Sequence, residues 1–351
     1  MIRSHGYAAL ERGGDLVAFD FERGSMGVSD ILVDIKFCGV CHSDLHAVDN
    51  DWGFHSYPLV PGHEIVGMVT DTGSHVTRFQ IGDWVGIGSI IDSCRTCSPC
   101  EAGLEIYCDE GATPSFGGAD RSGQMTFGGF SNKYVVSESY AVRIPSELDP
   151  ARAAPLLCAG ITTFSPFNKA QLKSGDRVGI VGLGGLGHLA IKWARAFGAD
   201  VVVFTTSPDK AADALALGAC EVIISSDPEQ MAHQTKRFNF IMDTVSAPHD
   251  VSGYLDFLKL DGVLFLTGMP AQAAAISPMQ LAWGRRVVTS SMTGGIAETQ
   301  EMLEFAARHD IAADVEVLPI AQLNTVFDRL RRNDVRFRFV VEMAALKGGI
   351  A

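Results

Sequence analysis

A glycine-rich turn constrains the fold of this chain more than any other feature. In VGIVGLGGLGHLAIKWA, an apolar run leads into a stretch whose apolar residues recur at helical spacing. Glycines spaced G-x-G-x-x-G in this context permit a tight turn, let a pyrophosphate approach the backbone and let the helix pack on the strand. The helix N-terminus then offers free N–H groups to phosphate. A strand–turn–helix without a ligand is the alternative. We expect a dinucleotide to bind here, through Gly182, Gly184, Gly185, Leu186 and Gly187.

Short apolar runs recur after Pro150, and stretches with helical spacing separate most of them. Such runs are typical of strands that are buried on both faces of a parallel sheet. Together with the glycine turn they predict an α/β fold, with a doubly wound Rossmann domain over residues 153–292. The runs are RVGIVGLGG, DVVVFTTS, EVIIS, FNFIMDTV, GVLFLTG and RRVVTSS.

The chain on either side of this domain has a different pattern. Residues 1–152 contain short β-type runs with tight turns and no long helical period, which predicts an irregular β-rich lobe. Residues 293–351 predict two helical stretches, AETQEMLEFAARH and IAQLNTVFDRLRRND, and then a strand in RFRFVVEM. Periodicity alone leaves open whether this tail extends the Rossmann sheet or returns to the first lobe.

The bulk composition excludes some classes of function. A formal net charge of −13 disfavours binding to nucleic acid or to an anionic membrane. The first residues, MIRSHGYAALERGG, lack the apolar core of a signal peptide, and no apolar run reaches the about 18 residues of a membrane span. We therefore expect a cytoplasmic protein. In that reducing compartment, clustered cysteines are metal ligands more often than disulfides.

Four of the eight cysteines lie in DSCRTCSPCEAGLEIYC, with the spacing C-x2-C-x2-C-x7-C. Four thiolates complete the tetrahedral shell of zinc and leave no position for a substrate, so such a site stabilises a loop rather than performing chemistry. An iron–sulfur cluster, or cysteines without a metal, are the alternatives. We expect a structural zinc held by Cys94, Cys97, Cys100 and Cys108.

The end of the second Rossmann strand, VVVF, bears on the choice of dinucleotide. NAD sites usually place an acidic residue there to hold the ribose 2′-hydroxyl. Here Asp200 precedes the strand and Asp209 follows the turn. Hydroxyl groups and a lysine would instead bind a 2′-phosphate, although the lysine could simply be a surface residue. We expect NADP(H), with contacts from Thr205, Thr206, Ser207 and Lys210.

Three separated residues could form a second metal site. Cys41 lies in GVCHSDLH, His63 in VPGHEIVG, and Cys158 in LLCAGITTFSP. A catalytic zinc takes three protein ligands and keeps an open position, which a Cys2His set would provide. The spacing does not decide the matter, because single histidines and buried cysteines are usually packed in a core.

Together these motifs resemble the zinc-containing medium-chain alcohol dehydrogenases. Within that family the chain is most similar to the cinnamyl-alcohol-dehydrogenase branch, which includes bacterial NADPH-dependent aldehyde reductases. The resemblance implies a GroES-like catalytic lobe made from residues 1–152 and 293–351, with the Rossmann domain inserted between them. It covers essentially the whole chain, in family order, through CGVCHSDLH, PGHEIVG, the cysteine cluster, PLLCAGITT, GLGGLGH, TTS, GGIAETQEML and RFRFVV.

The resemblance also implies roles for individual residues. Cys41, His63 and Cys158 match the ligands of the catalytic zinc, and Glu64 matches an acid beside the metal that can coordinate it. Asp44 matches the acid that orients the ligand histidine. Ser43 and His46 match a proton relay that runs through the cofactor ribose, and ordinary hydrogen bonding on a helix is the alternative for these two residues. Further contacts with the cofactor are implied for His42, Thr162 and Arg338.

The implied activity is hydride transfer between NADPH and a broad range of aromatic or medium aliphatic aldehydes. Two zinc ions per chain, a small-molecule substrate and a homodimer formed through the Rossmann sheet edge are expected. Cys38 and Cys220 match no ligand position and are expected to be packed thiols. Aromatic and apolar residues that either line the substrate pocket or pack in a core are Trp52, Phe54, Tyr57, Phe116 and Met292.

Three rival interpretations remain. A polyol or other secondary-alcohol dehydrogenase would favour an acidic residue at the strand end and a different ligand set. Zinc-free quinone reductases share the fold but lack both cysteine groups. A zinc-ribbon interaction protein would need basic residues around the cysteines, whereas a single Arg95 stands among Asp92, Glu101, Glu105, Asp109 and Glu110.

Overall fold

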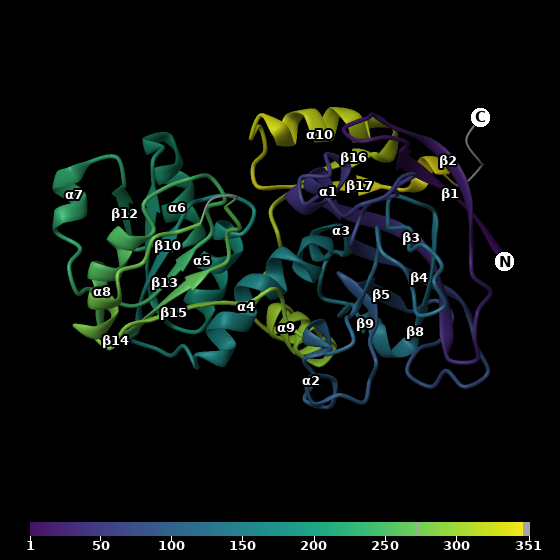
Figure 1. Cartoon of the computed structure of the whole chain (residues 1–351), viewed down its shortest axis with the longest axis horizontal. Coiled ribbons are helices and arrows are strands. Elements are labelled where there is room, and N and C mark those ends of the chain that lie inside the picture. Colours follow the sequence, from purple (N-terminus) through teal and green to yellow (C-terminus); the bar gives the residue numbers. More distant parts are fainter. Residues whose placement is uncertain (271–272, 347–351) are drawn as a thin grey trace. The chain divides into compact units, whose positions relative to one another are not determined.

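The computed structural model describes residues 1–270 and 273–346, and it divides into two compact units. The catalytic lobe comprises Met1–Cys158 together with the chain from Gly294 onward, and the nucleotide unit comprises Ala159–Thr293. The tail therefore returns to the first lobe. In Figure 1 the yellow strands of the tail join purple and blue strands from the beginning of the chain.

The first boundary lies at Cys158 rather than at the predicted residue 152, and the second lies one residue after the predicted 292. The cause of the first difference is local. Helix α3 (Pro150–Ala153) and the 3-10 turn η3 (Ala154–Leu157) pack against strands β3 and β4 of the catalytic lobe. Leu156 and Leu157 are buried there, so this segment adds to the core of the first unit.

The main sheet of the catalytic lobe has the strand order β16-β17-β3-β4-β5-β9, and β8 also pairs with β3. Strand β17 runs parallel to β16 and antiparallel to β3, so the end of the chain supplies an inner strand of this sheet. The strands of the main sheet are β3 (Asp30–Val40), β4 (Glu64–Thr72), β5 (Trp84–Ile87), β8 (Lys133–Ser137), β9 (Val142–Arg143), β16 (Val315–Pro319) and β17 (Arg338–Glu342). Two small ribbons add β1 (Ile2–Ala9) with β2 (Leu16–Arg23), and β6 (Ile90–Asp92) with β7 (Thr113–Pro114).

Alternation along β3 explains its place at the centre of the lobe. Ile31, Val33 and Ile35 are buried at intervals of two, as expected for one face of a strand. Helix α10 (Leu323–Arg331) covers apolar surface with Leu323, Val326, Phe327 and Leu330, spaced as one helical face. The remaining helices of the lobe are α1 (His42–Val48), α2 (Ser98–Glu101) and α9 (Ile296–Arg308).

The nucleotide unit contains a parallel sheet in the order β12-β11-β10-β13-β14-β15. Numbered from its own first strand, this is the order 3-2-1-4-5-6 of the doubly wound dinucleotide fold, which confirms the predicted Rossmann domain. Ligands of such sheets bind where the strand order reverses, at the carboxyl ends of β10 and β13. The strands are β10 (Arg177–Val181), β11 (Asp200–Thr205), β12 (Glu221–Ile224), β13 (Phe238–Asp243), β14 (Leu258–Leu266) and β15 (Val287–Ser290).

Among the described residues of this unit, five α-helices accompany the sheet, and α4 packs against α5. They are α4 (Ala159–Lys169), α5 (Gly187–Ala196), α6 (Ala211–Leu217), α7 (Pro228–Ala232) and α8 (Pro278–Ala282). Of the helices within residues 1–270 and 273–346, none has both the length and the apolar character needed to cross a bilayer.

Candidate active site and metal centres

A buried carboxylate organises the start of helix α1. Asp44 accepts hydrogen bonds from the backbone N–H of Cys41 at 2.9 Å and from that of Gly62 at 3.0 Å. Its Oδ1 also lies 3.0 Å from Nδ1 of His63. One fully buried side chain therefore fixes the helix start, the turn before β4 and the orientation of the imidazole.

The structure brings four predicted residues together around this carboxylate. One donor atom each from Cys41, His63, Glu64 and Cys158 lies within 4.8 Å of the other three. We call these four residues the catalytic cluster. The Cys158 thiol interacts with Cys41 and lowers the pKa of Cys41 well below its ordinary value, although burial acts in the opposite direction. Residues from three separate chain segments thus meet at one point.

Glu64 occupies an unusual environment within the catalytic cluster. One carboxylate oxygen pairs with Arg338 of β17, whereas Oε2 is buried without a hydrogen-bond partner. Burial raises the pKa of Glu64 to about 7, although Arg338 opposes that rise. Gly39 faces this carboxylate across the β3–β4 pairing, and a Cβ at position 39 would lie 1.8 Å from Oε2. Only glycine leaves room for the glutamate there.

The catalytic cluster fits a zinc ion. It offers two sulfur atoms, one imidazole and one carboxylate, which are the donor types that zinc prefers. Asp44 engages Nδ1 of His63, so Nε2 is the nitrogen left for a metal, as is usual for metal-binding histidines. The unsatisfied Oε2 of Glu64 is a buried acceptor that a cation would satisfy.

The two predicted relay residues lie on α1, beside the cluster. Ser43 Oγ lies 3.6 Å from Cys41 Sγ, and the half-exposed His46 has its Nδ1 2.7 Å from Oδ2 of Asp51. Sequence reasoning missed Asp51, although an acid five residues after the histidine and just beyond the helix end was a usable signal. This carboxylate fixes the imidazole orientation.

Four further cysteines form a separate group, the cysteine loop (residues 92–111). The four sulfur atoms also lie within 4.8 Å of one another. Backbone N–H groups donate to Cys94 at 3.3 Å, to Cys108 at 3.3 Å and to Cys97 at 3.5 Å. N–H groups of Thr96 and Cys97, together with neighbouring thiols, lower the pKa of Cys94 to about 6. Thiolate stabilisation by backbone donors suits a closed four-sulfur metal site.

The fourth sulfur has a side-chain partner instead. Ser93 Oγ lies 3.1 Å from Cys100 Sγ and 2.6 Å from the hydroxyl of Tyr140. Both Ser93 and Tyr140 are buried, so this short chain of hydroxyl groups is shielded from water. The loop also contacts the returning tail, because Glu105 accepts a hydrogen bond from the N–H of Ile296 at the start of α9.

In the nucleotide unit the glycine turn has the geometry that its sequence predicts. Gly182 has a φ of +91°, in the region that favours glycine. A Cβ at Gly187 would lie 2.1 Å from the carbonyl oxygen of Gly182, whereas nothing lies within 4 Å of one at Gly184. Gly182 and Gly187 therefore allow the helix to pack closely on the strand, whereas Gly184 leaves open space beside the backbone.

The end of β11 carries the residues predicted for the 2′-phosphate. Thr206 and Lys210 are exposed, and the Lys210 ammonium donates to the carbonyl of Leu183 in the glycine turn at 3.3 Å. The N–H of Ser207 donates to Thr205 Oγ1 at 3.2 Å. A positive charge therefore lies beside the turn, and hydroxyl side chains follow at the end of the same strand, which suits a phosphate group.

Comparison with known proteins identifies the family. A model of the alcohol dehydrogenase GroES-like domain matches residues 27–146, and a zinc-binding dehydrogenase model matches residues 185–308. NADP-dependent alcohol dehydrogenase C 1 from Mycolicibacterium smegmatis is 46% identical over 342 residues, covering 97% of this chain and 98% of that protein. The chain belongs to the zinc-binding alcohol dehydrogenase family.

Two further comparisons refine its place among these alcohol dehydrogenases. A protein from Fragaria ananassa named "Probable mannitol dehydrogenase" is 47% identical over 343 residues, covering 97% of this chain and 95% of that protein. The structure of a cinnamyl alcohol dehydrogenase from Sorghum bicolor matches with a TM-score of 0.96 and 42% identity over 100% of both chains. The resemblance to the cinnamyl-alcohol-dehydrogenase branch is thereby confirmed.

Other predicted residues of this alcohol dehydrogenase have mixed surroundings. His42 is exposed on α1, and Arg338 is buried with Glu64 as its partner. Thr162 donates from its hydroxyl to the carbonyl of Met292 at 3.3 Å within the nucleotide unit. Their predicted contacts with the cofactor stay predictions.

Of the two thiols expected to be packed, one was predicted correctly. Cys38 is fully buried in the core of the catalytic lobe, but Cys220 is exposed. It stands between α6 and the first residue of β12, in a turn at the outer strand of the sheet, where its N–H and Sγ both face the carbonyl of Val201. The expectation of a packed Cys220 was wrong because edge turns remain open to solvent.

The aromatic candidates divide between packing and exposure. Phe116 is buried with its ring centroid 5.7 Å from that of His63, and the Tyr57 hydroxyl donates to the carbonyl of Val48 at 2.8 Å. Trp52 and Phe54 are exposed and stack on each other at 5.8 Å. Trp52 also lies 5.6 Å from the ring of His46, so an aromatic surface adjoins the relay histidine.

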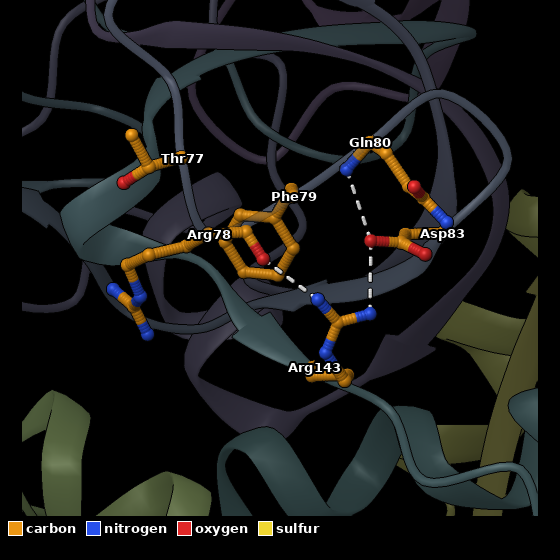
Figure 2. Close-up of a pocket in the computed structure, with 6 residues that line it drawn as sticks. All are labelled: Thr77, Arg78, Phe79, Gln80, Asp83 and Arg143. Atoms are coloured by element: carbon orange, nitrogen blue, oxygen red, sulfur yellow. Dashed lines mark hydrogen bonds and ion pairs between the residues drawn. The ribbon is translucent and has the colours of Figure 1, made fainter.

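A pocket of about 320 Å³ on the catalytic lobe lies apart from these residues (Figure 2). Its guanidinium group from Arg143 pairs with Asp83 at 2.8 Å and donates to the carbonyl of Arg78 at 2.7 Å. The charges of Arg143 and Asp83 therefore offset each other, and we assign the pocket no ligand. Its lining residues are Thr77, Arg78, Phe79, Gln80, Asp83 and Arg143.

Proposed function

We propose that this chain is an NADP(H)-dependent zinc alcohol dehydrogenase that reduces aromatic and medium aliphatic aldehydes and catalyses the reverse oxidation. The observation that carries the proposal is the catalytic cluster, which combines a Cys2His donor set with a carboxylate whose Oε2 lacks a partner. Three protein ligands leave a position open, as catalytic zinc sites require. Zinc bound there would supply a Lewis acid for the substrate oxygen.

The residues around the cluster have distinct roles in this proposal. Cys41, His63 and Cys158 hold the metal, and Asp44 fixes the imidazole of His63. Glu64 lies close enough to serve as an additional ligand when the open position changes occupant. The two thiolates lower the net charge of the site, which favours release of a neutral alcohol.

Proton movement is proposed to run through helix α1. The Ser43 hydroxyl, next to Cys41, would give a proton to the oxygen of the reduced product and regain a proton that comes from His46. The half-exposed His46 exchanges a proton with solvent, and Asp51 keeps its ring oriented for that exchange. A positioned acid–base chain of this kind contributes about 10²–10⁴-fold to a rate.

The dinucleotide is proposed to bind at the glycine turn of the nucleotide unit, from Gly182 to Gly187, and to supply the hydride. Exposed Thr206 and Lys210, with half-exposed Ser207, favour a 2′-phosphate, because an ammonium group and hydroxyls attract the anion that an acidic residue would repel. The mycobacterial relative is named as an NADP-dependent enzyme, which supports the same choice.

A polyol is the second candidate substrate. The relative from Fragaria ananassa, which is 47% identical and is named as a probable mannitol dehydrogenase, favours this alternative. The exposed aromatic pair Trp52 and Phe54 beside His46 favours an apolar, planar substrate instead. We therefore place the aldehyde first.

The test is NADPH oxidation with cinnamaldehyde or benzaldehyde, with NADH and with mannitol plus NADP⁺ in parallel. Purified protein should turn over the aldehydes with NADPH and contain two zinc ions per chain. Cys158→Ala should lose one zinc ion and its activity, whereas Cys220→Ala, which changes an exposed thiol, should keep both. Activity retained in Cys158→Ala would remove this cysteine from the catalytic site. Preference for NADH would contradict the assignment of Lys210.

A homodimer and a cytoplasmic location also belong to the proposal. The edge strand β15 and its neighbourhood expose Trp283 to 81%, Met279 to 62% and Leu260 to 68%. An exposed apolar sheet edge of this kind is a usual place for a symmetric partner. The free cysteines of both metal groups favour a reducing compartment. Trp283→Glu should shift the molar mass measured by light scattering from that of a dimer to that of a monomer.

A further inference from the structure

His249 and Asp243 form a hydrogen-bonded pair that has no role in the reaction proposed above. Asp243 is the last residue of β13 and is almost fully buried. Its Oδ2 lies 2.8 Å from Nε2 of His249. The other ring nitrogen, Nδ1, lies 2.9 Å from the carbonyl oxygen of Ala247. The imidazole is thus held from both ends.

This geometry requires an additional proton. A carbonyl oxygen only accepts hydrogen bonds, so Nδ1 must carry a hydrogen, and an ionised carboxylate requires one on Nε2 as well. The alternative arrangement has the proton on Asp243, which then donates to Nε2. Burial raises the pKa of Asp243, which brings this arrangement within reach. In both arrangements, His249 and Asp243 together carry one proton more than a neutral imidazole and an ionised carboxylate would carry.

The segment that the pair closes lies against the dinucleotide turn. Asp243 Oδ1 accepts from the N–H of Val245 at 3.0 Å, and Thr244 donates through its N–H and its hydroxyl to Val181 at 3.0 and 2.8 Å. A Cβ at Gly182 would lie 2.8 Å from Cγ2 of Val245 and 3.0 Å from Oγ1 of Thr244. Residues 244 and 245 therefore form a wall beside the first glycine of the turn.

Other ionisable groups face the pair. Asp250, on the same segment, interacts electrostatically with His249. Tyr254, from the 3-10 turn η5 (Ser252–Phe257), has its ring centroid 6.3 Å from that of His249. Burial raises the pKa of Tyr254 well above its ordinary value, so its phenol stays neutral.

We propose that His249 is a positioning residue for dinucleotide binding, and that the proton it shares with Asp243 holds residues 244 and 245 against the glycine turn. This inference rests on the proposed dinucleotide site. Loss of that proton at higher pH leaves the lone pair of Nε2 facing a carboxylate, which breaks the 2.8 Å contact. Cofactor affinity should therefore be highest at low pH and fall as the pair deprotonates.

The test is a fluorescence titration of the full-length protein with NADPH across a pH series, with zinc content and circular dichroism measured for each variant. His249→Ala should weaken NADPH binding about tenfold at low pH, the loss expected for one charge-assisted hydrogen bond, and should remove the pH slope. His249→Gln keeps a donor for Asp243 that does not titrate, so it should bind NADPH tightly and without the slope. Wild-type affinity should approach that of His249→Ala as pH rises.

Either of two results would overturn the inference. One is a His249→Ala variant with the affinity and pH slope of the wild type. The other is a His249→Gln variant that keeps the wild-type slope, which would assign the titration to another group. The same series is run with NADH, because residues 244 and 245 adjoin a turn that any dinucleotide uses. Binding of NADH alone would contradict the NADP(H) assignment but still test His249, and binding of neither would overturn both.

Discussion

The two cysteine groups of the catalytic lobe have similar atoms but are built differently. In the cysteine loop, four sulfurs come from residues 94–108, and backbone N–H groups from the same segment donate to three of them. In the catalytic cluster, the donors come from the start of α1, the start of β4 and the residue after η3, and a buried carboxylate orients one of them. The first group depends on local geometry, whereas the second depends on the whole lobe.

This difference indicates that the cysteine loop contributes to stability, whereas the catalytic cluster is suited to chemistry. A closed set of four thiolates gives a metal no free position, so its contribution is to hold the loop and the start of α9. The catalytic cluster offers two sulfur atoms and one imidazole, together with a carboxylate that is only half satisfied. Such incomplete satisfaction costs stability and marks functional sites.

The largest effects should come from removing one cysteine of each group. Cys158→Ala should abolish activity while leaving the melting temperature close to that of the wild type, because the rest of the lobe can still pack. Cys100→Ala should lower the melting temperature and make the cysteine loop sensitive to protease, because metal binding there contributes folding free energy. Calorimetry and limited proteolysis on both variants measure the contrast. Equal loss of stability in the two variants would break the comparison.

A methyl group at position 39 should have the next largest effect. The Cβ of Gly39→Ala would lie 1.8 Å from Oε2 of Glu64 and must displace that carboxylate from Arg338. Separating a buried ion pair costs about 3–5 kcal/mol of unfolding free energy. Urea unfolding measures this cost. Gly24→Ala, in the same lobe, is the control for an added methyl group, since its Cβ would meet only Oε1 of Gln124, at 3.6 Å.

Removing the charge of Asp44 should weaken the catalytic cluster without touching the cysteine loop. Asp44→Asn keeps the size of the side chain but replaces an acceptor that serves Cys41, Gly62 and His63. Loss of such an orienting partner typically lowers metal affinity or activity about 10–100-fold. Zinc content after mild chelation and kcat should both fall. Asp51→Asn is the control, because it should lower kcat with the zinc content unchanged.

The smallest effect should come from the hydroxyl chain under the cysteine loop. Tyr140→Phe removes the partner of Ser93 at 2.6 Å and should cost about 1 kcal/mol. Zinc release to a chelator should become faster for the cysteine loop, while kcat stays unchanged. A lower kcat with unchanged zinc release would link Tyr140 to the catalytic cluster instead.

The sequence predicted what local spacing encodes. Short continuous segments of the sequence encode the glycine turn, the individual Rossmann strands and the cysteine loop. The structure contains all three. The spacing of Cys41, His63 and Cys158 could not show whether they form a metal site, and the family resemblance predicted that they do. The structure brings those residues together, but their roles remain proposals.

What the sequence did not reveal depends on pairing between distant segments. Gly39 matters because the β3–β4 register puts it opposite Glu64, and no local pattern marks that. Tyr140 reaches Ser93 from 47 positions away. The pairing of His249 with Asp243 needs the turn after β13 to fold back on the strand end. In each case the information lies in tertiary contacts rather than in periodicity.

The order of strands in the catalytic lobe also bears on how the chain can be made. The nucleotide unit is one continuous segment, so it can fold as soon as it leaves the ribosome. The catalytic lobe cannot, because Phe339 of β17 pairs with Val40 of β3 inside its main sheet. Arg338, the partner of Glu64, arrives with that same strand. During synthesis the nucleotide-binding half should therefore be complete while the metal-binding half still lacks an inner strand, and the reactive thiols of the catalytic cluster are enclosed last.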